Sequence, residues 1–122
     1  MSVSKIFLSA IATLSISGCV SLSNSARQGR VDAQADISRG QLAIESAGMP
    51  FRWDPNYKRL LRQRYGIEFR IVGGCMITEE AAEHLRTYNE VMMSEITRKY
   101  GSDVLEKTEA EAKKMTSIPS DG

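Results

Sequence analysis

Two short segments of the chain alternate between apolar and polar positions. In residues 41–47, Leu42 and Ile44 lie on one side of an extended chain. In residues 67–71, Phe69 lies with two isoleucines on the side opposite the charged residues. A period of two is typical of a half-buried strand. The pattern therefore predicts one strand in each segment.

Apolar residues recur every three or four positions between these segments, which is the period of an amphipathic helix. Residues 54–65 begin with Asp54 before Pro55 and end before Gly66. We expect the Asp54 carboxylate to accept hydrogen bonds from free N–H groups of the first helical turn, and Gly66 to cap the last turn. The apolar side of this helix consists of Tyr57, Leu60, Leu61 and Tyr65.

A longer helical pattern follows the second strand. Thr78 is suited to cap this helix, and Gly101 ends it. Two glutamates in its first turn interact favourably with the positive end of the helix dipole. Its apolar positions are Ala81, Leu85, Tyr88, Met92 and Ile96. Ser102 is expected to open a last helix, with Leu105, Thr108, Ala112 and Met115 on its apolar side.

These elements predict an α+β fold, in which a small two- or three-stranded sheet is covered by a long C-terminal helix and a shorter helix. The folded domain is expected to span residues 36–115, with a disordered tail at residues 116–122. A domain this small is expected to be stable by only a few kcal/mol unless it forms a homodimer or binds a partner. Neighbouring parallel strands would be joined by a right-handed crossover.

The N-terminus has a different pattern, in which Lys5 precedes an apolar run at residues 6–16. This run has the length of a signal-peptide core, and it is shorter than the roughly 20 residues of a membrane-spanning helix. It closes on Ile16-Ser17-Gly18-Cys19, which resembles the lipobox of bacterial lipoproteins, where small residues precede a cysteine. The alternative is an ordinary secretory signal with an incidental cysteine. No family is recognised for residues 41–115.

The resemblance implies that residues 1–18 are removed as a signal peptide and that Cys19 carries the lipid, including palmitate. Several acyl chains together hold a protein firmly to a membrane. Val20 after the cysteine, in place of aspartate, favours by the same resemblance the outer membrane over the inner one, with the domain facing the periplasm. Residues 19–35 are expected to form the lipidated cysteine and a flexible tether, because residues 21–30 are rich in Ser, Asn and Gly. A short helix at residues 31–39 is expected to stop at Gly40.

The net charge argues against a nucleic-acid partner. Removal of Lys5 with the signal leaves fifteen of the sixteen basic residues against fifteen acidic ones, whereas nucleic-acid binders usually carry a basic excess. The charges are unevenly placed, because residues 52–70 have a positive excess and residues 79–111 a negative one. The two regions are expected to pair across the domain, or the basic one to meet an acidic partner or anionic lipid headgroups.

Few side chains suggest catalysis. Cys75 is the one thiol left once Cys19 is acylated, so no intramolecular disulfide is expected. We expect it to be buried at a strand end and unreactive, since no basic cluster lies beside it. His84 is expected to be a boundary residue of its helix, the alternative being a general base near Glu80 and Tyr88. The sequence predicts no metal, no cofactor and no enzyme, and a thiol- or carboxylate-dependent enzyme is the least favoured alternative.

Aromatic and basic residues offer a candidate surface for a partner. Phe51 and Trp53 lie in the turn after the first strand, where they either form an exposed anchor or fold back over the core. Lys58, Arg59 and Arg62 lie opposite the apolar side of the next helix. The sequence thus predicts a membrane-anchored envelope lipoprotein whose domain is a non-catalytic protein-binding or structural module. Its partner would be an envelope protein or peptidoglycan, and the alternative is a periplasmic immunity protein that inhibits a delivered toxin.

Overall fold

The computed structural model describes residues 20–117 and confirms the α+β prediction. Its elements are α1 (Val20–Ser38), β1 (Leu42–Ala47), α2 (Asp54–Tyr65), β2 (Ile67–Gly73), α3 (Glu79–Tyr100) and α4 (Val104–Ser117). From β1 onward they follow the predicted order. The signal-peptide residues, Cys19 and residues 118–122 lie outside the described part of the chain. Within the described part, no helix is both long enough and apolar enough to cross a membrane.

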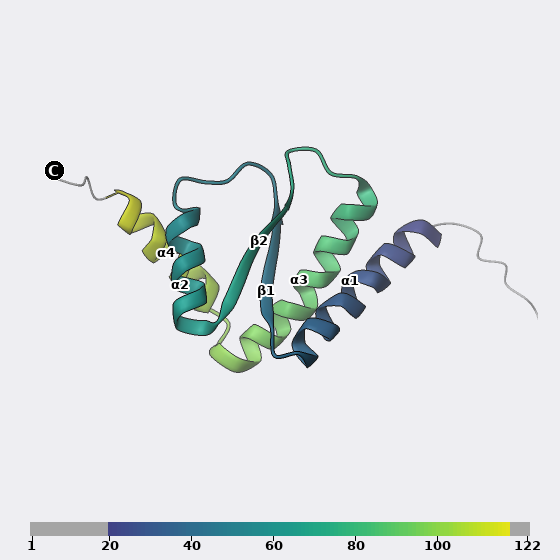
Figure 1. The fold of residues 1–122 in the computed structure, drawn as a ribbon, viewed down its shortest axis with the longest axis horizontal. Coiled ribbons are helices and arrows are strands. Elements are labelled where there is room, and N and C mark those ends of the chain that lie inside the picture. Colours follow the sequence, from purple (N-terminus) through teal and green to yellow (C-terminus); the bar gives the residue numbers. More distant parts are fainter. Residues whose placement is uncertain (1–19, 118–122) are drawn as a thin grey trace, which may run out of the picture.

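β1 and β2 form a two-stranded parallel sheet between two pairs of helices (Figure 1). Leu42 pairs with Ile67 at the start of the sheet, and the register shifts after Ser46. Successive residues of β2 point to opposite sides, because the Phe69 ring meets Tyr57 of α2 whereas Arg70 reaches across to α1 and α3. The sheet is therefore covered by α2 and α4 on one side and by α1 and α3 on the other.

The buried core joins these layers. Its large side chains come from the predicted apolar sides of the helices and strands, whereas Met115 at the end of α4 is exposed. The core consists of Ala33, Leu42, Ala43, Tyr57, Leu60, Leu61, Ile67, Tyr88, Met92, Ile96, Val104 and Ala112.

The prediction of a flexible tether at residues 21–30 is wrong, because these residues belong to α1, which packs along α3. The expected helix at residues 31–39 is the second half of the same element. Small residues at Ala26, Gly29 and Ala33 are buried along one side of α1, so its backbone can approach α3 closely. The folded unit therefore includes α1 and does not begin at residue 36.

Two helix starts differ from the expected ones. The Asp54 carboxylate accepts a hydrogen bond from the Phe51 backbone N–H at 2.9 Å, and Trp53 occupies the cap position of α2 with no side-chain cap. α4 begins two residues after Ser102, and the Asp103 carbonyl accepts its first backbone hydrogen bond from Lys107. Thr78 caps α3 as expected, with its hydroxyl accepting from the Ala81 N–H at 3.1 Å. At the C-terminus, α4 continues through Ser117, so Thr116 is helical and not part of a disordered tail.

Candidate functional site, an aromatic pocket beside a basic helix face

The turn between β1 and α2 forms one wall of an open pocket of about 330 Å³. Phe51 and Trp53 stack nearly parallel, with ring centroids 5.2 Å apart. Trp53 meets the Tyr57 ring edge-on at 5.6 Å, and Tyr57 meets Phe69 at 5.3 Å. The four rings thus form a continuous aromatic row from the exposed turn to the sheet.

The two predicted aromatic residues have different surroundings. Phe51 is 64% exposed, whereas Trp53 is half-buried and packs against the core. Trp53 therefore folds back over the core, whereas Phe51 is exposed, and its role as an anchor for a partner stays a prediction. Met49 in the same turn is also exposed.

Two carboxylates line the same pocket. Asp54 is buried at the start of α2, and Glu109 reaches the pocket from α4. Burial, together with the negative charges of Glu109 and Asp54, raises the pKa of Tyr57 to about 12. No basic residue is among the side chains that line the pocket. The lining thus has two carboxylates and no basic group, and one of these carboxylates, Glu109, is paired with Lys113 of α4.

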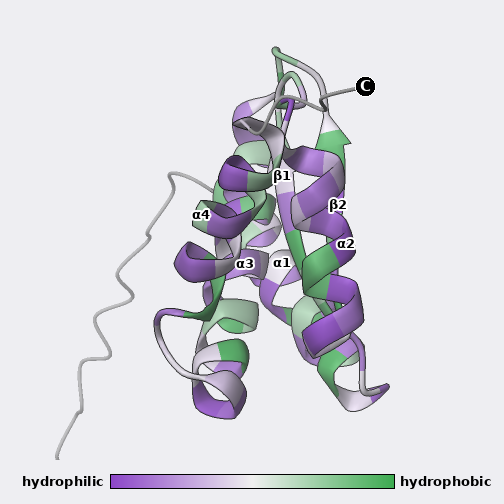
Figure 2. Ribbon diagram, turned by 90° about the vertical axis from the view of Figure 1, so that its left-hand side faces the viewer, coloured by the Kyte–Doolittle hydropathy of each residue, from purple (hydrophilic) through white to green (hydrophobic). Residues whose placement is uncertain are grey.

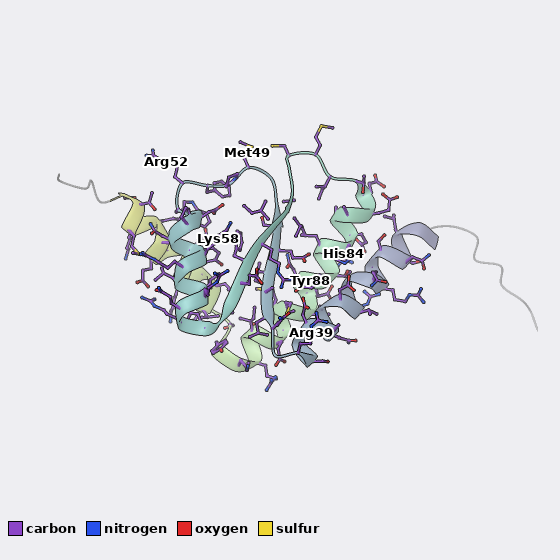
Figure 3. All side chains as sticks on the ribbon, in the orientation of Figure 1. Arg39, Met49, Arg52, Lys58, His84 and Tyr88 are labelled. Carbon is purple, nitrogen blue, oxygen red and sulfur yellow. The ribbon has the colours of Figure 1, made fainter. Side chains whose placement is uncertain are left out.

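The outer face of α2 is basic and adjoins the pocket. Arg59 and Arg62 are exposed, Lys58 is half-buried, and a shallow depression lies between them. Figure 3 shows Met49 and Arg52 on the turn above α2 and Lys58 on the helix itself. A second depression, lined by Phe51, Asp54 and Lys58 among others, connects the pocket with this face.

These three basic side chains have no carboxylate partner in the part of the chain that the structure describes. None has a carboxylate of the described residues within 4 Å. Lys58 contacts the Phe69 ring, and Arg59 donates to the Asn56 side chain. The expected pairing between α2 and the acidic region is found at Arg64, which binds Glu111 of α4 through two hydrogen bonds. The candidate residues Lys58, Arg59 and Arg62 therefore remain available to a partner, and with Phe51 and Trp53 they form what we call the α2 surface.

A polar network on the other side of the sheet was not predicted from the sequence. Asp36 of α1 accepts hydrogen bonds from the Tyr88 hydroxyl at 2.7 Å and from Arg70 at 3.2 Å, and it also pairs with Arg39. Burial tends to raise the pKa of Asp36, but the three donors outweigh burial and lower it. Burial and the Asp36 carboxylate raise the pKa of Tyr88. The network joins α1, β2 and α3.

His84 lies at the edge of this network as a half-buried boundary residue of α3. Its Nε2 lies 2.8 Å from Asp32 of α1, and its Nδ1 lies 4.0 Å from Glu45 of β1. The hydrogen bond with His84 lowers the pKa of Asp32, whereas burial raises the pKa of Glu45. Figure 3 places His84, Tyr88 and Arg39 on the α1 and α3 side, away from Lys58. Among the described residues, no group of three or more His, Cys, Asp and Glu side chains is arranged to hold a metal ion.

Cys75 is exposed, so the expectation that it is buried at a strand end is wrong. The chain turns away from the sheet immediately after β2, and this loop does not pack over the core. Its neighbour Met76 is 94% exposed, and Val72 at the end of β2 is exposed as well. Figure 2 shows hydrophobic colour at this end of β2.

Comparison with known proteins adds no relative: no protein-family model matches the chain, and no curated protein or solved structure matches it by the criteria applied.

Proposed function

We propose that this chain is a lipid-anchored lipoprotein of the cell envelope, held on the periplasmic side of the outer membrane, whose domain binds another envelope protein through the α2 surface. The observation that carries the binding role is the exposed Phe51 ring, stacked on Trp53 beside basic side chains that have no carboxylate partner in the described residues. Aromatic residues backed by a rigid core are frequent hot spots of protein interfaces. Unpaired charge beside them steers a complementary partner and fixes its orientation.

The position of α1 affects how the domain would stand on the membrane. α1 begins at Val20, directly after the cysteine that the lipobox resemblance selects for acylation. A lipid on Cys19 would therefore connect to the first turn of a packed helix and not to a ten-residue flexible spacer. In this proposal the domain stays close to the headgroups, and its partner is found near the same membrane.

The anchor is tested by Cys19→Ser in cells supplied with labelled palmitate. We expect loss of the label and release of the protein from sedimented membranes, because one thiol accepts the lipid. Cys75→Ser is the matched control, and it should keep both the label and the membrane association. Persistent labelling of the Cys19→Ser chain would contradict the lipoprotein assignment.

The binding surface is tested by photocrosslinking in cells. A photoreactive phenylalanine analogue at position 51 preserves an aromatic ring there, and we expect irradiation to give one discrete protein adduct. The same analogue at position 90, an exposed site on α3, should give none. An envelope protein in the adduct supports the proposal, and a delivered toxin in its place would support the immunity alternative. Equal adducts from both positions would contradict a dedicated surface.

A further inference from the structure

The aromatic pocket contains a buried carboxylate oxygen that accepts no hydrogen bond. Asp54 is 4% exposed, and its Oδ2 accepts from the Phe51 N–H. Its Oδ1 is buried and has no donor among the described residues. Buried acceptors are nearly always satisfied in folded proteins, because an unmet one is costly. A hydrogen-bond donor on a ligand that reached Asp54 would therefore satisfy this acceptor.

The same pocket favours a positively charged donor. Asp54 and Glu109 supply two carboxylates to its lining, of which Glu109 is also paired with Lys113, and no lining side chain is basic. Four aromatic rings line the same pocket, and the face of an aromatic ring attracts a cation through its quadrupole. The Asp54 carboxylate, which has no ion-pair partner among the described residues, and the π faces together favour a cation over a neutral donor such as a hydroxyl.

The molecule already holds one ammonium group at the edge of this pocket. Lys113 of α4 places its Nζ 4.9 Å from the centroid of the Trp53 ring and 2.5 Å from a carboxylate oxygen of Glu109. Lys113 is not among the residues that line the cavity. Ring face and carboxylate are thus spaced to suit an ammonium group.

The size of the cavity limits the ligand. A volume of about 330 Å³ lies at the lower end of ligand pockets, so it suits a single side chain better than a large molecule. An ammonium group on a flexible aliphatic chain can reach past Phe51, with its methylenes against the rings and its three N–H donors toward Asp54 and Glu109.

We propose that this pocket binds a lysine side chain of the partner protein. The inference rests on the proposed protein-binding function and adds the chemistry of the contact. Asp54 and Glu109 receive the ammonium group, and the aromatic row contacts the aliphatic chain. The basic face of α2 meets acidic residues of the partner around this lysine.

The test is titration of the acylated full chain in detergent micelles with N-acetyl-lysine methylamide. Trp53 is the one tryptophan of the chain, so its fluorescence reports on the pocket directly. We expect a dissociation constant of about a millimolar, typical of so small a ligand. The norleucine analogue has the same aliphatic chain without the ammonium group, and it should bind at least tenfold more weakly. Equal binding of the two probes would overturn the proposal.

Variants identify the residues responsible. Asp54→Asn keeps an acceptor for the Phe51 N–H but removes the negative charge, and it should weaken lysine binding at least tenfold. Glu109 is less buried than Asp54. Glu109→Gln should weaken lysine binding severalfold, and it decides the question if the Asp54 variant does not fold. Glu90→Gln removes a charge far from the pocket and should leave binding unchanged. Unchanged binding in both pocket variants would overturn the assignment.

The outcome is separable from that of the proposed function. Crosslinks from position 51 without lysine binding would contradict the proposed lysine contact and leave the protein-binding function standing. Lysine binding without any crosslink would support an amine-binding pocket and contradict the protein-binding function.

Discussion

Gly29→Ala should lower the free energy of unfolding by about 2–4 kcal/mol and separate α1 from α3. A β-carbon at position 29 would meet the Thr87 hydroxyl and the His84 carbonyl oxygen more closely than real β-carbons approach other atoms, and it would lie 3.1 Å from the Tyr88 nitrogen. Two of these three atoms belong to the α3 backbone, so no change of rotamer relieves the overlap. The two helices must move apart, which exposes the buried small residues of α1.

Helix propensity alone predicts the opposite result, because alanine is favoured over glycine inside a helix by about 1 kcal/mol. The measurement is urea unfolding followed by circular dichroism. Gly74→Ala is the matched control, since a β-carbon there has no neighbour within 4 Å, and it should change stability by no more than about 0.5 kcal/mol. A more stable Gly29→Ala protein would show that α1 does not pack on α3.

Asp36→Ala should lower the free energy of unfolding by about 2–3 kcal/mol at neutral pH. The substitution removes the acceptor shared by Tyr88, Arg70 and Arg39. The Tyr88 hydroxyl and the Arg70 guanidinium, which are partly buried, then lose the carboxylate to which they donate. Tyr88→Phe removes one donor and should cost about 1 kcal/mol. Glu90→Ala, which breaks an exposed pair with Arg86, should cost no more than about 0.5 kcal/mol.

The effect of Asp36 should depend on pH with a definite sign. Its pKa is lower in the folded protein than the ordinary value of 3.8, so the folded state keeps the carboxylate ionised at a pH where the unfolded state protonates it. The contribution to stability is therefore present above about pH 4 and lost as the pH falls through the folded pKa. Unfolding curves of the wild-type and Asp36→Ala proteins should converge on acidification. A constant difference down to pH 2 would contradict the network.

Local patterns were sufficient for the elements from β1 to α4 and for the second half of α1, whereas the first half of α1 was missed for a physical reason. Its buried side consists of small residues, and hydropathy scarcely distinguishes alanine, glycine and serine from a spacer. The spacing of Ala26, Gly29 and Ala33 by three and four residues is the signal that could have revealed it. Such a pattern stabilises a helix only through a close partner, and that partner, α3, lies more than fifty residues later.

Part of the candidate site could be predicted from local patterns, and part of it depends on packing between distant elements. Phe51 and Trp53 are neighbours in one turn, and the basic residues follow from the helical period of α2, so both sets could be named from the sequence. Glu109 joins them through packing of α4, which no local pattern shows. The Asp36 network likewise depends on three elements that are distant in sequence. The charged residues of β2 suggested a side of the strand that faces solvent, but helices cover this side.

Binding of a protein partner by the α2 surface is tested most directly by the yield of the position-51 adduct in cells when Arg59 and Arg62 are both changed to glutamate. We expect the yield to fall at least tenfold, because the reversed charges repel the acidic surface that meets α2. Reversing two charges on α3, with Glu83→Arg and Glu90→Arg, should leave the adduct unchanged. An undiminished adduct from the Arg59→Glu, Arg62→Glu chain would contradict the account.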